Sequence, residues 1–328
     1  MLIALSAVAT MFFGLAPMAA RALTISPPTF DFTVSPGNTI KDVVRVLNES
    51  DEAIVITPEA FNFTAKEEVQ GSPDFYPADE ERNGYELAPW IKFPRESVTI
   101  EARKNFNLEY SIEVPENAQP GGHFGAIHLK VSKPGQTAEE GATVSVQGVT
   151  SSLIFVRVTG DLTEELNVAQ FAGEQVMYTH LPVDLNLRVE NKGTVHLRPV
   201  GNVFITNMFG RQVASLDVNP TMRSVLPASA RRFEISWFKR RVADGASELT
   251  KEIKNFAFGK YTATLVLNYG LDNKVAGASY DFWVIPWQAL LLILGVLLAV
   301  AFILKYAVRG YNSMVIRRYE ALKRQPKE

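Results

Sequence analysis

Four histidines are the side chains of this sequence best suited to metal binding or proton transfer. His123 and His128 are five positions apart in one apolar segment, and an odd step places two side chains of a regular strand on opposite faces. His180 and His196 stand singly near turn-forming residues. A zinc site shared by His123 and His128 would need a bulge between them. The histidines therefore predict no metal site.

Carboxylates gather in a long segment, GSPDFYPADEERNGYELAP, from Gly71 to Pro89. Its Asp79-Glu80-Glu81 cluster could bind calcium, but it lacks the alternating ligands and central glycine of an EF-hand loop. A solvated acidic loop is the favoured interpretation, although a segment of this length is often functional. Paired carboxylates for glycoside hydrolysis can come from distant strands, and nothing in the sequence points to such a pair.

The sequence contains no HExxH, GxSxG, P-loop or GxGxxG pattern. It has no cysteine, which excludes disulfides, thiolate metal ligands and cysteine nucleophiles. We therefore expect a protein that is not an enzyme, with no catalytic residue, no metal and no cofactor. No ligand-binding residue is assigned.

Glycines are concentrated in the run PGGHFGAI, from Pro120 to Ile127. Gly121, Gly122 and Gly125 could serve a tight entry into a strand, where glycine permits a positive φ. They could also leave bare backbone for the close approach of a glycan or peptide. The structural role is the favoured interpretation.

The elements that must carry these residues are strands, because apolar and polar residues alternate repeatedly. Five apolar side chains share one face of the segment Phe106–Val114, and the segments Val183–Val189 and Tyr261–Tyr269 show the same period of two. Turns rich in Pro, Gly and Asn separate the segments, and both halves of the chain repeat this outline. The sequence predicts an all-β protein with two tandem immunoglobulin-like β-sandwiches, at residues 23–160 and 161–281.

An apolar block near the C-terminus predicts a single transmembrane helix at residues 282–304. Trp287 to Leu304 reads WQALLLILGVLLAVAFIL, without a charge. The tail at residues 305–328 carries seven basic and two acidic residues, and positively charged flanks stay in the cytoplasm. We therefore expect a single-pass protein of the cell membrane, with a cytoplasmic basic tail and an ectodomain outside the cytoplasm.

The N-terminal residues 1–22 predict a signal peptide for export. An apolar run from Leu2 to Leu15 precedes Ala20-Arg21-Ala22, which matches an A-x-A cleavage site before Leu23. No Lys or Arg precedes the apolar run, so an uncleaved N-terminal anchor is the alternative. Either interpretation places the sandwiches outside the cytoplasm.

Charge excludes nucleic acid as a partner of the ectodomain. Removal of the tail and Arg21 from the chain's 33 basic and 35 acidic residues leaves 25 basic and 33 acidic residues, a net charge of −8. Binding to nucleic acid needs a cationic surface. A cysteine-free exported protein is also typical of a bacterial envelope.

Three segments of the first half resemble the peptidoglycan-binding domain of the WxL-interacting protein family. They are SPPTFDFTVSPGNTIKDVVRVLNES, WIKFPRESVTIEARKNFNLEYSIEVP and VPENAQPGGHFGAIHLKVS, within a match that covers about Ile25 to Val158. The order of signal peptide, immunoglobulin-like domain, second sandwich, membrane helix and basic tail is also similar. The resemblance implies attachment to peptidoglycan and to other surface proteins without catalysis.

The leading hypothesis is a non-enzymatic, membrane-anchored cell-surface protein that attaches to cell-wall polymer or to another envelope protein. Open sheet edges of a sandwich could pair with an added strand. The alternative is a membrane-tethered chaperone or scaffold for exported surface proteins. An enzyme with a dispersed active site is the third hypothesis.

Overall fold

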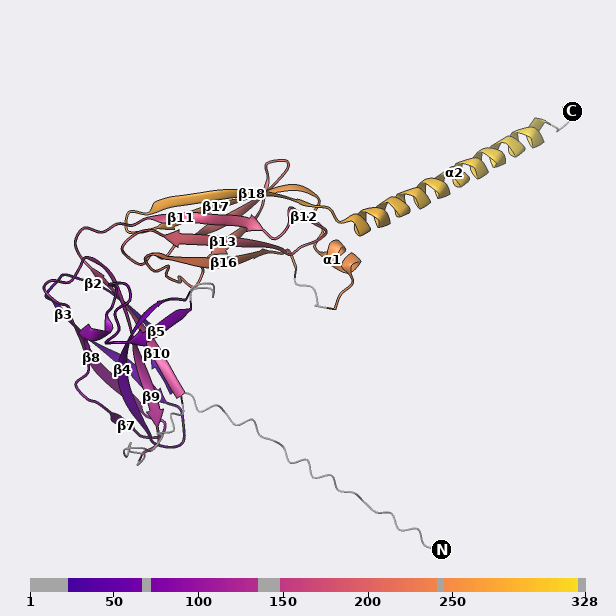
Figure 1. Ribbon diagram of the computed structural model, residues 1–328. Coiled ribbons are helices and arrows are strands. Elements are labelled where there is room, and N and C mark those ends of the chain that lie inside the picture. Colours follow the sequence, from indigo (N-terminus) through magenta and orange to yellow (C-terminus); the bar gives the residue numbers. More distant parts are fainter. Residues whose placement is uncertain (1–22, 67–71, 135–147, 241–244, 324–328) are drawn as a thin grey trace, which may run out of the picture. The chain divides into compact units, whose positions relative to one another are not determined.

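The computed structural model describes residues 23–66, 72–134, 148–240 and 245–323 (Figure 1). The predicted signal peptide at 1–22 and residues 324–328 of the predicted tail lie outside the described residues. The chain divides into two compact units. The first unit contains Met1–Phe63 and Phe75–Gly160, and the second contains Thr64–Asp74 and Asp161–Glu328.

The first unit is a β-sandwich with strand orders β1-β3-β8-β6 in one sheet and β2-β10-β9-β4-β5 in the other, where β7 also pairs with β4. Strand β10 runs parallel to β2 and antiparallel to β9. A short 3₁₀ helix, η1 (Ala88–Trp90), precedes β6. The strands are β1 (Leu23–Ser26), β2 (Thr29–Val34), β3 (Thr39–Asn48), β4 (Ile54–Ala65), β5 (Pro73–Pro77), β6 (Ile91–Lys92), β7 (Val98–Ile100), β8 (Asn105–Glu113), β9 (Gly121–Ser132) and β10 (Gly148–Val158).

Alternation in the sequence explains how the first core forms. Strand β8 buries Leu108, Tyr110 and Ile112 against Val44 and Val46 of the neighbouring strand β3. Full burial of an apolar side chain of this size contributes about 1.5–3 kcal/mol. The segment that the sequence predicts as a strand with one apolar face is therefore a central part of the sandwich core.

The second unit is a smaller β-sandwich, with strand orders β11-β13-β16 and β12-β18-β17-β14-β15. Its core contains Leu185, Leu187 and Val189 from the predicted segment Val183–Val189. The all-β fold of two sandwiches is confirmed. The strands are β11 (Leu166–Gly173), β12 (Met177–Tyr178), β13 (Val183–Asn191), β14 (Val200–Asn207), β15 (Gln212–Val218), β16 (Ser229–Trp237), β17 (Gly259–Tyr269) and β18 (Lys274–Val284).

A buried asparagine closes the equivalent turn in each sandwich. Asn48, the last residue of β3, donates from Nδ2 to the carbonyl oxygens of Glu52, Ile100 and Glu101. Asn191, the last residue of β13, donates to the carbonyl oxygens of Val195 and Val225. Each side-chain oxygen also accepts a backbone N–H two residues later, from Ser50 and Gly193 respectively. These bonds satisfy backbone groups that the turns remove from the sheets.

Two helices follow in the second unit, α1 (Glu248–Lys254) and α2 (Trp287–Lys323). Helix α2 is long and apolar enough over Trp287–Arg318 to cross a membrane. The sequence places the start of the span at residue 282, and this position is wrong. Phe282 and Val284 belong to β18, where they pair with Tyr261 and Gly259 and are fully buried in the sandwich core. Their apolar character serves that core, and α2 begins at Trp287.

Candidate binding groove in the first sandwich

Strand β9 is buried on both faces, because a second apolar layer covers the outside of its sheet. Ile127 and Leu129 point into the sandwich core. Phe124 instead packs outside that core, with ring centroids 5.9 Å from both Phe63 and Phe155. The segment after β4 closes over them through Phe75 and Tyr85. We call these five rings the outer aromatic cluster: Phe63, Phe75, Tyr85, Phe124 and Phe155.

Asn62 holds the acidic segment in this position. It is completely buried, and its Oδ1 accepts the backbone N–H groups of Leu87 and Ala88 at 3.0 and 2.8 Å. Its Nδ2 donates to the carbonyl oxygens of Pro77 and Glu80. One side chain therefore ties both ends of residues 77–88 to β4. The polar residue between Phe61 and Phe63 was the sequence signal for this role, and our sequence reasoning missed it.

Glu86 orders the turn within the same segment. Its carboxylate accepts the backbone N–H groups of Arg82 and Asn83 at 2.7 and 3.0 Å, and the Tyr76 hydroxyl at 3.1 Å. Burial acts to raise the pKa of Glu86, but these donors outweigh burial and lower it. Burial next to Glu86 raises the pKa of Tyr76. The cluster Asp79-Glu80-Glu81 is exposed, and Glu80 forms an ion pair with Arg82 at 2.7 Å.

His123 and His128 occupy different layers. His123 lies beside Trp90, with ring centroids 4.4 Å apart, and its ring nitrogens contact the carbonyl oxygens of Glu86 and Gln119. His128 stacks on Phe61 at 4.3 Å in the outer layer. Burial lowers the pKa of both histidines. The structure therefore does not bring these two side chains together.

The other two histidines belong to the second unit. His180 Nε2 lies 2.6 Å from Glu248 Oε2, and His196 is buried. Within the described residues, no group of three or more His, Asp or Glu side chains is arranged to hold a metal ion.

Gly122 and Gly125 are covered by their own chain. A Cβ on Gly122 would lie 2.6 Å from the Phe124 ring. A Cβ on Gly125 would lie 3.1 Å from Leu87 and 3.2 Å from Ile91. Gly121 has a positive φ of 142° at the entry to β9. The favoured structural role of the three glycines thus accounts for all of them, and a ligand has no access to their backbone at the covered positions.

An open groove of about 460 Å³ lies beside the acidic segment, between β4 of one sheet and β6 of the other. Its volume is in the range of ligand-binding sites. The floor includes Ala60, Ile91 and Phe93, which also pack against the sandwich core. Lys92 is exposed at the rim, where its Nζ donates to the carbonyl oxygen of Pro89 at 2.9 Å. The groove is lined by Pro58, Glu59, Ala60, Phe61, Pro77, Ala78, Ala88, Pro89, Ile91, Lys92 and Phe93.

Strand β4 presents backbone to this groove, because its two neighbours on that side leave a gap. Strand β7 pairs with Ile54–Ile56, and β5 lies at the other end of β4 (Figure 1). At the tip of the hairpin Lys66 N donates to Ser72 O, and at the end of β5 the carbonyl oxygen of Pro77 accepts from Asn62 Nδ2. In the described part of the chain the pairing of β7 ends at Ile56, so Thr57–Ala60 form an open stretch of the β4 edge, of which Pro58, Glu59 and Ala60 line the groove. Such an edge can accept an additional strand.

No protein-family model matches the chain, and no curated protein sequence matches it either. Solved structures that resemble it include the class 5 fimbriae chaperone CfaA. The alignment covers 80% of this chain and 99% of CfaA, at 13% sequence identity and a TM-score of 0.39. The alignment with the E. coli chaperone DraB covers 80% of this chain and 97% of DraB, at 11% identity and a TM-score of 0.35. The alignment with a PapD-like domain of human CEP192 covers 48% of this chain and 98% of that domain, at 11% identity and a TM-score of 0.29. Likeness of this degree transfers no ligand, partner or reaction to this chain.

Proposed function

We propose that this protein is a non-enzymatic, membrane-anchored binding protein of the bacterial envelope. Its first sandwich holds an extended segment of another exported protein along the open edge of β4. The observation that carries this proposal is the position of Thr57–Ala60, which has no strand partner on the groove side among the described residues and lies next to an apolar groove. The predicted signal peptide and the apolar helix α2 support export and anchoring.

Strand addition fits both the backbone and the side chains of this site. Backbone groups of the added segment would pair with β4, while alternate side chains would enter the groove. Small apolar side chains suit the surface made by Ala60, Ala78 and Ala88. Pro58 has no backbone N–H, so pairing is restricted to the residues around it. An extended apolar segment without charges at alternate positions is therefore the preferred ligand.

The same site serves a stable anchor or a transient chaperone, and the lifetime of the complex distinguishes them. An anchor keeps its partner at steady state, whereas a chaperone releases it after export. Peptidoglycan, implied by the family resemblance, remains a further proposal for the ligand. Sugars bind proteins through exposed aromatic faces. Among the described residues of the first unit, however, Val149 is the only exposed large hydrophobic side chain, and it is not aromatic. A protein ligand is therefore preferred.

Site-specific photo-crosslinking in cells tests the proposal. A photoreactive amino acid replaces Lys92 at the rim of the groove, and the matched control carries it at Thr99, which is exposed on β7 outside the groove. We expect an adduct to one exported protein from position 92 alone. Mass spectrometry of the adduct should locate the crosslink in an extended apolar segment.

A blocking variant makes the result specific to the groove. Ala78→Arg places a long charged side chain in the groove from a loop position, and Thr99→Arg is the control of equal size and charge. Ala78→Arg should abolish the adduct from position 92, and Thr99→Arg should leave it unchanged. Equal adducts from positions 92 and 99 would refute the groove as the binding site, and adducts to wall glycan would replace the protein ligand by peptidoglycan.

A further inference from the structure

Exposed aromatic side chains gather at one end of the second sandwich. Phe209, Phe238, Phe256, Phe258 and Trp283 are each at least 40% exposed, and Trp287 follows at the start of α2. We call these six residues the juxtamembrane patch. In the described residues that precede α2, no other aromatic side chain is among the exposed large hydrophobic residues. Their concentration at one end is therefore a specific feature of this surface.

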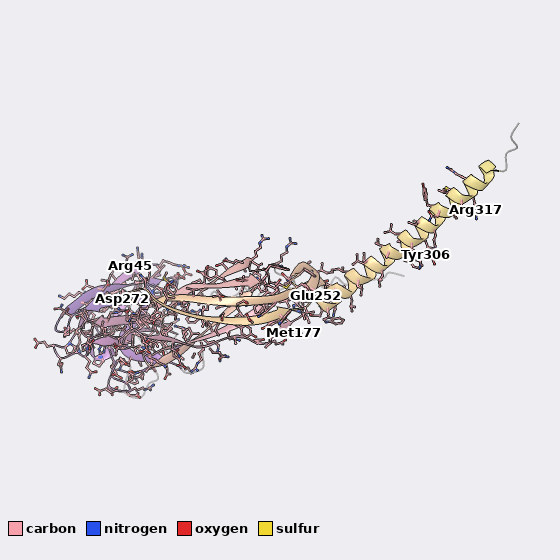
Figure 2. The ribbon with its side chains drawn as sticks, turned by 90° about the horizontal axis from the view of Figure 1, so that it is seen from above. Arg45, Met177, Glu252, Asp272, Tyr306 and Arg317 are labelled. Atoms are coloured by element: carbon pink, nitrogen blue, oxygen red, sulfur yellow. The ribbon has the colours of Figure 1, made fainter. Side chains whose placement is uncertain are left out.

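Strand pairing places the patch around the point where α2 begins. Trp283 pairs with Lys260 on β17, just after Phe258, and with the exposed Met177 on β12. Met208, next to Phe209 in the β14–β15 turn, lies over Gly259, where a Cβ would be 2.8 Å from its Cε. Figure 2 shows Met177 and Glu252 at the end of the unit from which α2 leaves, and Asp272 at the opposite end.

Helix α1 joins this end of the sandwich to α2 directly. Glu252 is buried, and its Oε2 accepts the backbone N–H of Ala289 in the first turn of α2 at 2.7 Å. Ile285 and Pro286 are the only residues between β18 and α2, and the N–H of Ile285 bonds to the carbonyl oxygen of Tyr178. The sandwich therefore has no free linker that could lift it away from the start of the helix.

Length fixes where this end must lie if α2 crosses a membrane. The uncharged run Trp287–Leu304 measures about 27 Å at 1.5 Å per residue, close to the thickness of a hydrocarbon core. Trp287 is then at one boundary of that core. The two connecting residues span at most about 7 Å, so the end of the sandwich lies within the headgroup layer.

We propose that the juxtamembrane patch is a lipid-contacting surface, with which the second sandwich rests in the outer headgroup layer of the membrane that α2 spans. The inference depends on α2 as a membrane span and is independent of the groove in the first unit. Tryptophan is favoured at the membrane interface, because its ring combines an apolar face with a polar N–H group, and phenylalanine is among the apolar residues with which interfacial helices enter the boundary between headgroups and acyl chains.

The charges at this end agree with a bilayer surface. Lys239, Arg240 and Lys254 are exposed there and can reach lipid phosphates. The carboxylate of Asp281 is paired with Lys260 at 2.6 Å, and that of Glu248 with Lys251 at 2.8 Å. The aromatic rings contribute burial that does not depend on lipid charge, so contact should persist in neutral phosphatidylcholine.

Depth measurements on single-cysteine variants test the proposal, because the chain has no cysteine of its own. Phe209→Cys and Leu271→Cys each receive an environment-sensitive fluorophore, and the full chain is reconstituted at one copy per phosphatidylcholine nanodisc. The two positions are matched, since Phe209 is 81% and Leu271 is 75% exposed. Leu271 is adjacent to Asp272, at the end of the unit away from α2 (Figure 2).

Nanodiscs that contain nitroxide-labelled phosphatidylcholine give the readout. We expect several-fold quenching of the probe at position 209 and little quenching at position 271. Phe258→Cys provides a second patch position and should be quenched like position 209. Equal quenching at positions 209 and 271 would overturn the proposal. It would also be overturned if a water-soluble quencher reached the probes at 209 and 258 as well as it reaches the probe at 271.

Discussion

At the scale of single residues, Asn62 connects strand β4 to the acidic segment of the first sandwich. Its four hydrogen bonds fix residues 77–88, which cover the outer aromatic cluster and form one wall of the groove. Loss of a buried hydrogen bond that leaves its partner unsatisfied costs about 1–3 kcal/mol. Asn62→Ala should therefore reduce the free energy of unfolding by about 3 kcal/mol.

Urea unfolding and hydrogen exchange of the fragment 23–286, which keeps all of β18, measure this effect. The amides of Leu87 and Ala88 should exchange much faster in Asn62→Ala, because their acceptor is the Asn62 side chain. Asn107→Ala, at an exposed position of β8, is the control and should change stability by less than about 0.5 kcal/mol. Unchanged exchange at residues 87 and 88 would contradict the role given to Asn62.

His128 should make the first sandwich sensitive to mild acid. Burial between aromatic rings lowers its pKa below the ordinary value of 6.5; Glu59 acts in the opposite direction and Lys130 in the same direction. The unfolded chain then binds a proton at a higher pH than the folded chain does. Stability is therefore lost as the pH falls below about 6.5, the pKa of histidine in the unfolded chain.

The histidine contribution can be separated by substitution. The free energy of unfolding should decrease between pH 7.5 and 5.5 in the native fragment, and the decrease should be smaller in His128→Phe, which cannot titrate. His123 retains part of the pH dependence, because burial lowers its pKa too. Acid effects from Glu86 appear only below about pH 4.5, because its pKa is lowered from 4.5. An identical slope in His128→Phe would refute this assignment.

At the scale of elements, the long strands were predictable because their burial has a period of two. Phe106–Val114, Val183–Val189 and Tyr261–Tyr269 correspond to β8, β13 and β17. Short elements such as β12 and α1 carry too few residues to show a period. The groove was not predictable, because it arises from where β5 and β7 end along β4. The start of α2 was misplaced, because the core residues of β18 and the exposed residues of α2 are both apolar and adjacent in sequence.

The junction of α1 and α2 offers a test of this element-level coupling. In Glu252→Ala, the Ala289 N–H in the first turn of α2 loses its acceptor. Hydrogen exchange at Ala289 should become faster in the full chain in nanodiscs, by an amount that corresponds to about 1–2 kcal/mol.

Glu248→Ala is the matched control on the same helix. It removes an exposed carboxylate whose ion-pair partners are Lys251 and His180, which both lie outside α2. Its effect on Ala289 should be small. Equal exchange at Ala289 in the native chain and in Glu252→Ala would show that the carboxylate does not hold the start of α2.

At the scale of the whole molecule, charge and hydrophobicity divide the chain into parts that belong in different environments. The two sandwiches carry the net charge of −8, α2 carries the apolar run, and the basic residues of the tail begin at Lys305. Positively charged flanks favour the cytoplasmic side. The expected arrangement has both sandwiches outside the cytoplasmic membrane and the C-terminal end of α2 inside.

Labelling of single cysteines in intact cells tests this orientation. Leu271→Cys lies on the second sandwich, and Ser313→Cys lies on α2 beyond Lys305. A membrane-impermeant maleimide should label position 271 in intact cells, because that side chain faces the outside. Position 313 should react only after the cells are permeabilised. The cysteine-free native chain provides a zero background. The opposite result would be labelling of position 313 in intact cells, with position 271 protected until permeabilisation. It would show the inverted orientation. The binding groove would then not be exported, and the proposed function depends on that export.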